Sequence, residues 1–198
     1  MLPRPRSDLK PNTADFERFP LVETPKDGKT ILIEGWMPGN PSKDIHRLGP
    51  RVAACLKQDG YHIIAFSAQP NVGIYSNVPH EFYHAPSDAK LNELYARATL
   101  LIKASLYDAR AGGPMEAMTK GTVTARALIK GDDDLVDHDN SLRCDYNESD
   151  LYFISKCLLE ERELREKLVK NCYDYVATQT WDHWMPKIKE VIWQSLLS

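Results

Sequence analysis

Residues 99–121 read Thr-Leu-Leu-Ile-Lys-Ala-Ser-Leu-Tyr-Asp-Ala-Arg-Ala-Gly-Gly-Pro-Met-Glu-Ala-Met-Thr-Lys-Gly, and this stretch decides the fold. Its apolar beginning, residues 99–103, predicts a buried strand, and Pro114 after Gly112-Gly113 predicts the start of a helix. Backbone N–H groups that the first turn of a helix leaves unused favour an anion. Glu116 follows in that turn, where a carboxylate accepts both hydroxyls of a ribose. The stretch therefore predicts a nucleoside diphosphate at the carboxyl end of a strand.

Short apolar runs alternate with amphipathic stretches along the rest of the chain. Strands are expected at residues 30–34, 61–66, 81–84, 99–103, 122–127 and 142–146, and helices at 87–98, 114–119, 151–159, 162–178 and 183–197. A further helix with Ile45, Leu48, Val52 and Leu56 on one face is expected to kink at Gly49-Pro50 or to begin at Pro50. This alternation predicts a Rossmann-like three-layer α/β domain over residues 30–198, with a mostly parallel sheet and C-terminal helices. Residues 1–29 are expected to form an extended linker anchored by Phe16 and Phe19.

The composition is that of an ordinary globular protein. The chain has 198 residues, 42% of them hydrophobic and 27% charged, which suits one domain. A formal net charge of −3 provides no basic surface for nucleic acid. No apolar run approaches the roughly eighteen residues of a membrane span, and residues 1–7 do not resemble a signal peptide. Four cysteines without Cys-x-x-Cys spacing favour buried free thiols over zinc, so a cytoplasmic protein is expected.

Residues 108–121 resemble the signature of the group 1 family of retaining GT-B glycosyltransferases, in which two acids are separated by seven residues. Here Asp108 and Glu116 are the acids, and Asp108 is one methylene shorter than the family's usual Glu. Further stretches follow in the family's order: Pro11-Asn12-Thr13-Ala14-Asp15, Gly35 to Lys43, Leu94-Tyr95, Gly131 to Val136, Asn140-Ser141-Leu142 and Thr180-Trp181. The match runs from Pro11 to about Trp193 and corresponds to the C-terminal, donor-binding half of such an enzyme.

The resemblance implies transfer of a sugar from a nucleoside diphosphate donor to an acceptor hydroxyl with retention, without a metal or other cofactor. It implies catalytic roles for three residues. Glu116 would accept the ribose hydroxyls, Asp108 would contact the donor sugar, and Lys43 would neutralise the leaving diphosphate. The implied donor-binding residues are Gly35, Ser42, Tyr83, His84, Arg110, Ala111, Gly112 and Gly113. Arg47 and Arg110 are candidates to replace the family's usual Arg, because Trp36 stands at that position.

The resemblance also implies a partner, the N-terminal acceptor domain, in cis or in trans. Peripheral membrane association would come only from parts of the protein beyond this chain. The departures at Thr13, Trp36 and Asp108 keep open an alternative, a non-catalytic module of the same fold that binds a nucleotide or a partner protein. The acidic run at residues 132–134 has two interpretations, a metal site or a solvated turn, and the absence of complementary ligands nearby favours the turn.

Overall fold

The computed structural model describes residues 15–34, 47–105, 112–127 and 139–197, and within them the chain forms one six-stranded parallel sheet. The strands are β1 (Thr30–Glu34), β2 (His62–Ser67), β3 (Glu81–His84), β4 (Leu100–Lys103), β5 (Val123–Ala127) and β6 (Leu142–Cys144). Their spatial order is β3-β2-β1-β4-β5-β6, with β1 next to β4 at the centre. This confirms the expected Rossmann-like α/β fold.

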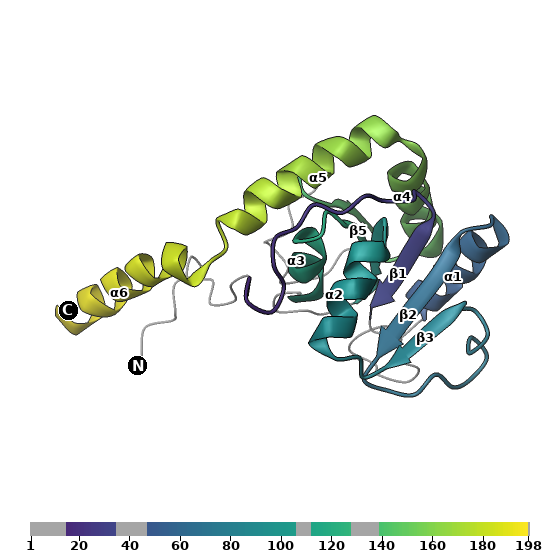
Figure 1. The fold of residues 1–198 in the computed structure, drawn as a ribbon, viewed down its shortest axis with the longest axis horizontal. Coiled ribbons are helices and arrows are strands. Elements are labelled where there is room, and N and C mark those ends of the chain that lie inside the picture. Colours follow the sequence, from purple (N-terminus) through teal and green to yellow (C-terminus); the bar gives the residue numbers. More distant parts are fainter. Residues whose placement is uncertain (1–14, 35–46, 106–111, 128–138, 198) are drawn as a thin grey trace.

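Helices cover both faces of the sheet (Figure 1). They are α1 (Leu48–Gln58), α2 (Asp88–Arg97), α3 (Gly112–Met118), α4 (Glu148–Glu160), α5 (Arg162–Ala177) and α6 (Trp181–Leu197). On one face, Ile31 and Ile33 pack in a core with apolar residues of α1 and α4. On the other face, Leu32 packs with residues of α2 and α3, among them Tyr95. Apolar residues on both sides of each central strand are expected when helices bury both faces.

Two helix starts differ from the sequence prediction. Helix α1 begins at Leu48, two residues before the predicted start at Pro50, and contains Pro50 in its first turn. A proline is tolerated there because the N–H groups of the first turn have no partner within the helix. Helix α3 begins at Gly112 rather than at Pro114, so both glycines belong to its first turn instead of a preceding loop.

The segment before β1 is fixed to the domain by Phe19, as expected. Phe19 is 1% exposed and packs edge-on against Tyr95, with ring centroids 6.0 Å apart. Beside it, Arg18 donates two hydrogen bonds to the Asp88 carboxylate, from Nε at 2.9 Å and from Nη2 at 2.7 Å. Phe16 packs against a smaller core that contains Met118 and Cys172. Residues 15–19 are thereby held against α2 and α3.

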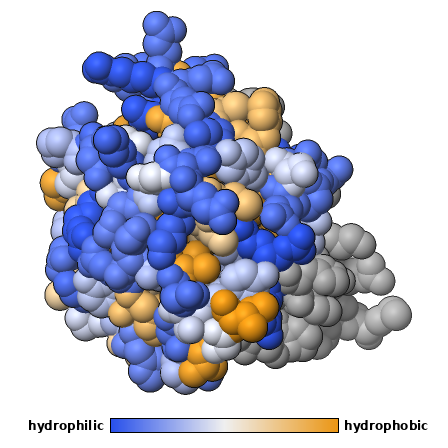
Figure 2. Space-filling view, turned by 90° about the vertical axis from the view of Figure 1, so that its right-hand side faces the viewer, coloured by the Kyte–Doolittle hydropathy of each residue, from blue (hydrophilic) through white to orange (hydrophobic). Residues whose placement is uncertain are grey.

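Helix α6 extends away from the sheet (Figure 1). Phe19 and Trp184 are buried, whereas Trp181, Ile192 and Trp193 are more than half exposed. The side of the molecule shown in Figure 2 is mostly hydrophilic, with smaller apolar areas between the polar residues.

The four cysteines are free, with Cys172 buried and the other three partly buried. Burial raises the pKa of the Cys172 thiol far above its ordinary value, which keeps it protonated and unreactive. Among the described residues, every helix is too short or too polar to cross a bilayer.

Candidate functional site

The carboxyl ends of β1 and β4 lie side by side, and the chain reverses its strand order between them. Ligands of open α/β sheets bind in the crevice at such a point. Ile33 of β1 is in register with Ile102 of β4, so the next residues, Glu34 and Lys103, end the two strands together. The Lys103 Nζ donates to Glu34 Oε1 at 2.5 Å, and the two side chains are only 6% and 18% exposed. A buried ion pair thus stands at this point of the sheet.

Glu116 of α3 lies beside this pair, close to a cavity of about 80 Å³ that is also lined by Asp15, Arg18 and Phe19. The Tyr95 hydroxyl donates a hydrogen bond to Glu116 Oε2 at 3.1 Å and fixes the carboxylate. Burial raises the pKa of Glu116, and the charge of Glu34 adds to this, while the Tyr95 hydrogen bond lowers it. Glu116 is therefore a partly buried hydrogen-bond acceptor that Tyr95 holds in one orientation.

The two glycines of α3 have different surroundings. A β-carbon on Gly112 would have Glu116 Oε1 as its nearest neighbour, at 3.8 Å. A β-carbon on Gly113 would lie 2.6 Å from the carboxyl carbon of Glu34 and closer still to Oε2. Gly113 is thus required for the close approach of the Glu34 carboxylate, a role that the sequence did not indicate.

Tyr83 and His84 end β3, two strands away from β1. The Tyr83 hydroxyl donates to Glu81 Oε2 at 2.6 Å, and the Lys90 ammonium lies 4.9 Å from the centre of the Tyr83 ring. His84 is exposed, and its Nε2 lies 3.0 Å from the carbonyl oxygen of Ala68. These residues are at the carboxyl end of β3, and Tyr83 packs against the apolar core that contains Tyr95.

The remaining predicted site residues lie outside the described residues. These are Gly35, Ser42, Lys43, Asp108, Arg110 and Ala111, together with Trp36 and the acidic run at 132–134. Arg47 is described, and it precedes α1 with a left-handed backbone, φ 54°. Within the described part of the chain, no three His, Cys, Asp or Glu residues are arranged to hold a metal ion.

Sequence analysis missed Glu34, Lys103 and Tyr95 as members of the site. A signal was present for the first two, because each places a charged residue at the last position of an apolar strand. Their pairing depends on the register between two strands that are 69 residues apart in the chain, which the sequence does not state. Tyr95 belongs to the Leu94-Tyr95 stretch that resembles the family, but no role in the site was expected for it.

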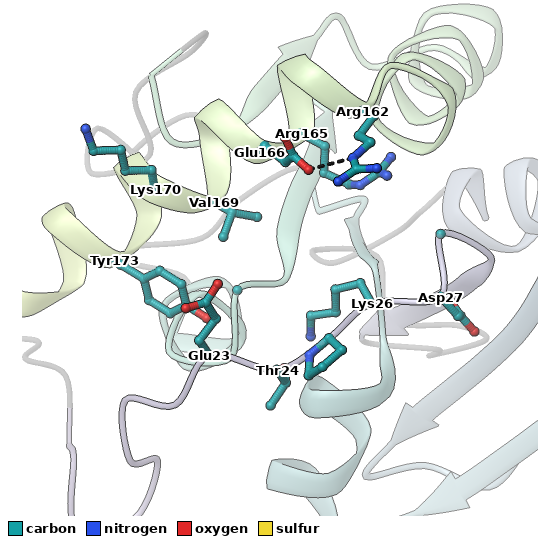
Figure 3. Close-up of a pocket in the computed structure, with 13 residues that line it drawn as sticks. Glu23, Thr24, Lys26, Asp27, Arg162, Arg165, Glu166, Val169, Lys170 and Tyr173 are labelled. Carbon is teal, nitrogen blue, oxygen red and sulfur yellow. Dashed lines mark hydrogen bonds and ion pairs between the residues drawn. The ribbon is translucent and has the colours of Figure 1, made fainter.

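A groove of about 700 Å³ lies elsewhere, between residues 23–28 and α5 (Figure 3). It is at the amino end of β1, opposite the carboxyl edge. Two of its basic groups are already engaged: Lys26 donates to the carbonyls of Tyr95 and Ala96, and Arg162 pairs with Glu166 at 2.7 Å. Burial lowers the pKa of Lys26 to about 7. We place the candidate site at Glu116, because ligands of open α/β sheets bind at the carboxyl edge, where the charged side chains of Glu116 and Lys103 lie.

Comparison with solved structures finds glycosyltransferases of similar architecture. TarM from S. aureus, in complex with fondaparinux, alpha-GlcNAc-glycerol and UDP, matches with a TM-score of 0.65 and 15% identity over 89% of this chain and 37% of its own. HepE from Anabaena, in complex with UDP-glucose, matches with a TM-score of 0.65 and 16% identity over 84% and 49%. A glycosyltransferase from Rickettsia africae matches with a TM-score of 0.65 and 16% identity over 87% and 49%.

This chain has the GT-B glycosyltransferase fold of these structures. It spans less than half the length of each of the three. No protein-family profile matches the sequence, and no curated protein does. The GT-B likeness is therefore one of backbone architecture, at an identity of 15–16%.

Proposed function

We propose that this chain is the donor-binding domain of a retaining, metal-independent glycosyltransferase. The donor is a nucleoside diphosphate sugar, and the acceptor is a hydroxyl group. In the reaction, the bond between the anomeric carbon and the diphosphate oxygen breaks, and a bond to the acceptor oxygen forms on the same face. The acceptor hydroxyl loses its proton, and the nucleoside diphosphate leaves with the electron pair of the broken bond.

The observation that carries this proposal is the position of Glu116. Its carboxylate lies in the crevice where open α/β sheets take their ligands, next to a small cavity, and the Tyr95 hydroxyl holds it in place. An ionised carboxylate of fixed orientation accepts two neighbouring hydroxyls without a proton transfer. That is the contact expected for the ribose of a nucleotide.

The other assigned roles remain part of the proposal. Lys43 neutralises the leaving diphosphate, and Asp108 contacts a hydroxyl of the donor sugar. Gly35, Ser42, Arg110, Ala111, Gly112 and Gly113 contribute to the phosphate and sugar sites, and Tyr83 and His84 contact the base. An acceptor domain, in cis or in trans, completes the active site. This is supported by the length comparison, because the chain corresponds to less than half of each solved neighbour.

Titration calorimetry with UDP, GDP and ADP and their glucose conjugates tests the proposal. The intact chain should bind one nucleotide series, and Glu116→Gln should weaken that binding by roughly 1.5–3 kcal/mol, the value of a hydrogen bond to a charged group. Glu190→Gln is the matched control, because Glu190 is an exposed acid on α6. Equal affinities for both variants and the wild type would remove Glu116 from the site.

Glycosyl transfer by this chain alone should be negligible with any donor that it binds. Retaining transfer requires the donor and acceptor sites to close over the sugar and exclude water. Rapid transfer by the isolated chain would show that the acceptor domain is not needed.

A further inference from the structure

The ion pair between Lys103 and Glu34 is unusual for the place where it lies. Two residues earlier on the same face of the sheet, β1 and β4 carry Leu32 and Leu101, which are completely buried. The last position of each strand is charged instead, and Lys103 is 4% exposed. Burying an ion pair costs more free energy than burying an apolar pair of similar size. The pair therefore needs an explanation beyond the stability of the sheet.

The Glu34 carboxylate is only partly satisfied in this arrangement. Its Oε1 accepts from Lys103, but Oε2 is buried and makes no hydrogen bond among the described residues. Oε2 faces Gly113, whose missing side chain permits the contact. The charge of Glu34 also raises the pKa of the nearby Glu116 carboxyl, because two carboxylates close together repel each other. Glu34 is thus an incompletely satisfied partner of the Lys103 ammonium, and another anion can take its place there.

We propose that Lys103 is a diphosphate-binding residue of the donor site and that the Glu34 carboxylate occupies its place until the donor arrives. A phosphate oxygen replaces Glu34 Oε1 on the Lys103 ammonium, and Glu34 turns toward solvent, to which 18% of its side chain is already exposed. This inference rests on the proposed function, because it takes the diphosphate of that donor as the ligand. It adds a cation and a competing anion to the site.

The proposal predicts a gain of affinity on removing an acid. Glu34→Gln keeps the size of the side chain but removes the charge that competes for Lys103. It should bind nucleoside diphosphate and inorganic pyrophosphate about tenfold more tightly, in line with the loss of one charge-assisted contact. The affinity for the nucleoside without phosphates should stay within twofold.

The double variant K103M/E34Q separates this mechanism from general repulsion between an acid and an anion. It also avoids leaving one buried charge without its partner, so the fold should be retained, as a thermal melt will check. If Lys103 binds the phosphate, the gain seen in Glu34→Gln is lost in the double variant. If Glu34 acts only through its distant charge, the gain persists there, and the proposal is overturned.

Two further arms complete the titration. Asp88→Asn removes another acid whose charge reaches Glu116, but that acid pairs with Arg18 on the surface, so pyrophosphate affinity should remain within twofold of the wild type. Pyrophosphate also distinguishes failures. If it follows the expected order but no nucleotide binds, the proposed function fails and the anion site at Lys103 stands. If Glu34→Gln binds neither probe more tightly than the wild type, the inference at Lys103 is wrong.

Discussion

Alanine at the two adjacent glycines of α3 should change stability in opposite directions. Both residues lie in the first turn of the helix, where alanine loses less backbone freedom on folding than glycine. That difference stabilises the alanine variant by roughly 0.5–1 kcal/mol when nothing opposes the new methyl group. At Gly112 the nearest atom is 3.8 Å away, an ordinary contact, so Gly112→Ala should gain up to about this amount.

Gly113→Ala should instead destabilise the protein. Its methyl carbon would lie 2.6 Å from the carboxyl carbon of Glu34, so the carboxylate has to move. Glu34 is held by Lys103 and partly buried, and displacing it disturbs the ion pair. Overpacking of this kind costs on the order of 1–3 kcal/mol, more than the helix gain. The net loss should be about 0.5–2 kcal/mol.

Urea denaturation of the two single variants measures both values. The background E34A/K103M is the control, because it removes the carboxylate without leaving the ammonium buried alone. In that background Gly113→Ala should become neutral or stabilising, like Gly112→Ala. The reasoning is refuted if Gly113→Ala is as stable as Gly112→Ala, or if its loss is unchanged when Glu34 is absent.

Three further predictions concern the same site. Tyr95→Phe should lower stability by about 1–3 kcal/mol in urea denaturation, since it removes the donor to the partly buried Glu116. Tyr173→Phe should change stability less, because the hydrogen bond from the Tyr173 hydroxyl to the Val22 carbonyl is exposed and long, at 3.4 Å. Donor affinity measured by calorimetry should fall as the pH is lowered toward the pKa of Glu116, which is raised above its ordinary 4.5, because a protonated carboxyl group accepts hydroxyls poorly. The affinity of Glu116→Gln should not show this pH dependence. Nucleotide binding should be unchanged in excess EDTA, and a strict need for magnesium or manganese would contradict the metal-independent mechanism.

The central strands were predictable because their residues are apolar on both faces, as expected for a sheet buried between helices. The expected ranges 30–34 and 81–84 match β1 and β3. Helix starts were less predictable, because glycine and proline are read as breakers but are tolerated in a first turn. Both Pro50 and Gly112 lie in such a turn. Phe19 was identified as an anchor because a large aromatic residue in a polar segment has to bury somewhere.

The candidate site was only partly predictable for a related reason. Glu116 could be found because its neighbours in sequence carry the pattern, and the chain folds locally there into one helix. The pairing of Glu34 with Lys103 depends on register, and the contact from Tyr95 depends on the rotation of α2 against α3. Such contacts between distant segments follow from tertiary packing and have no local signature.

The charged ends of β1 and β4 also indicate how stability and binding are divided in this sheet. Leu32 and Leu101, two residues before the strand ends, show that this face of the sheet accommodates apolar residues. The fold therefore does not require the charged residues Glu34 and Lys103 at the ends. A buried pair with one unsatisfied oxygen stabilises less than leucines would. If the pair served only packing, replacing both residues by apolar ones would raise stability without any effect on ligands. If Lys103 awaits a phosphate, the same replacement raises stability and lowers affinity together, which is the pattern expected where a binding site is built at the expense of the core.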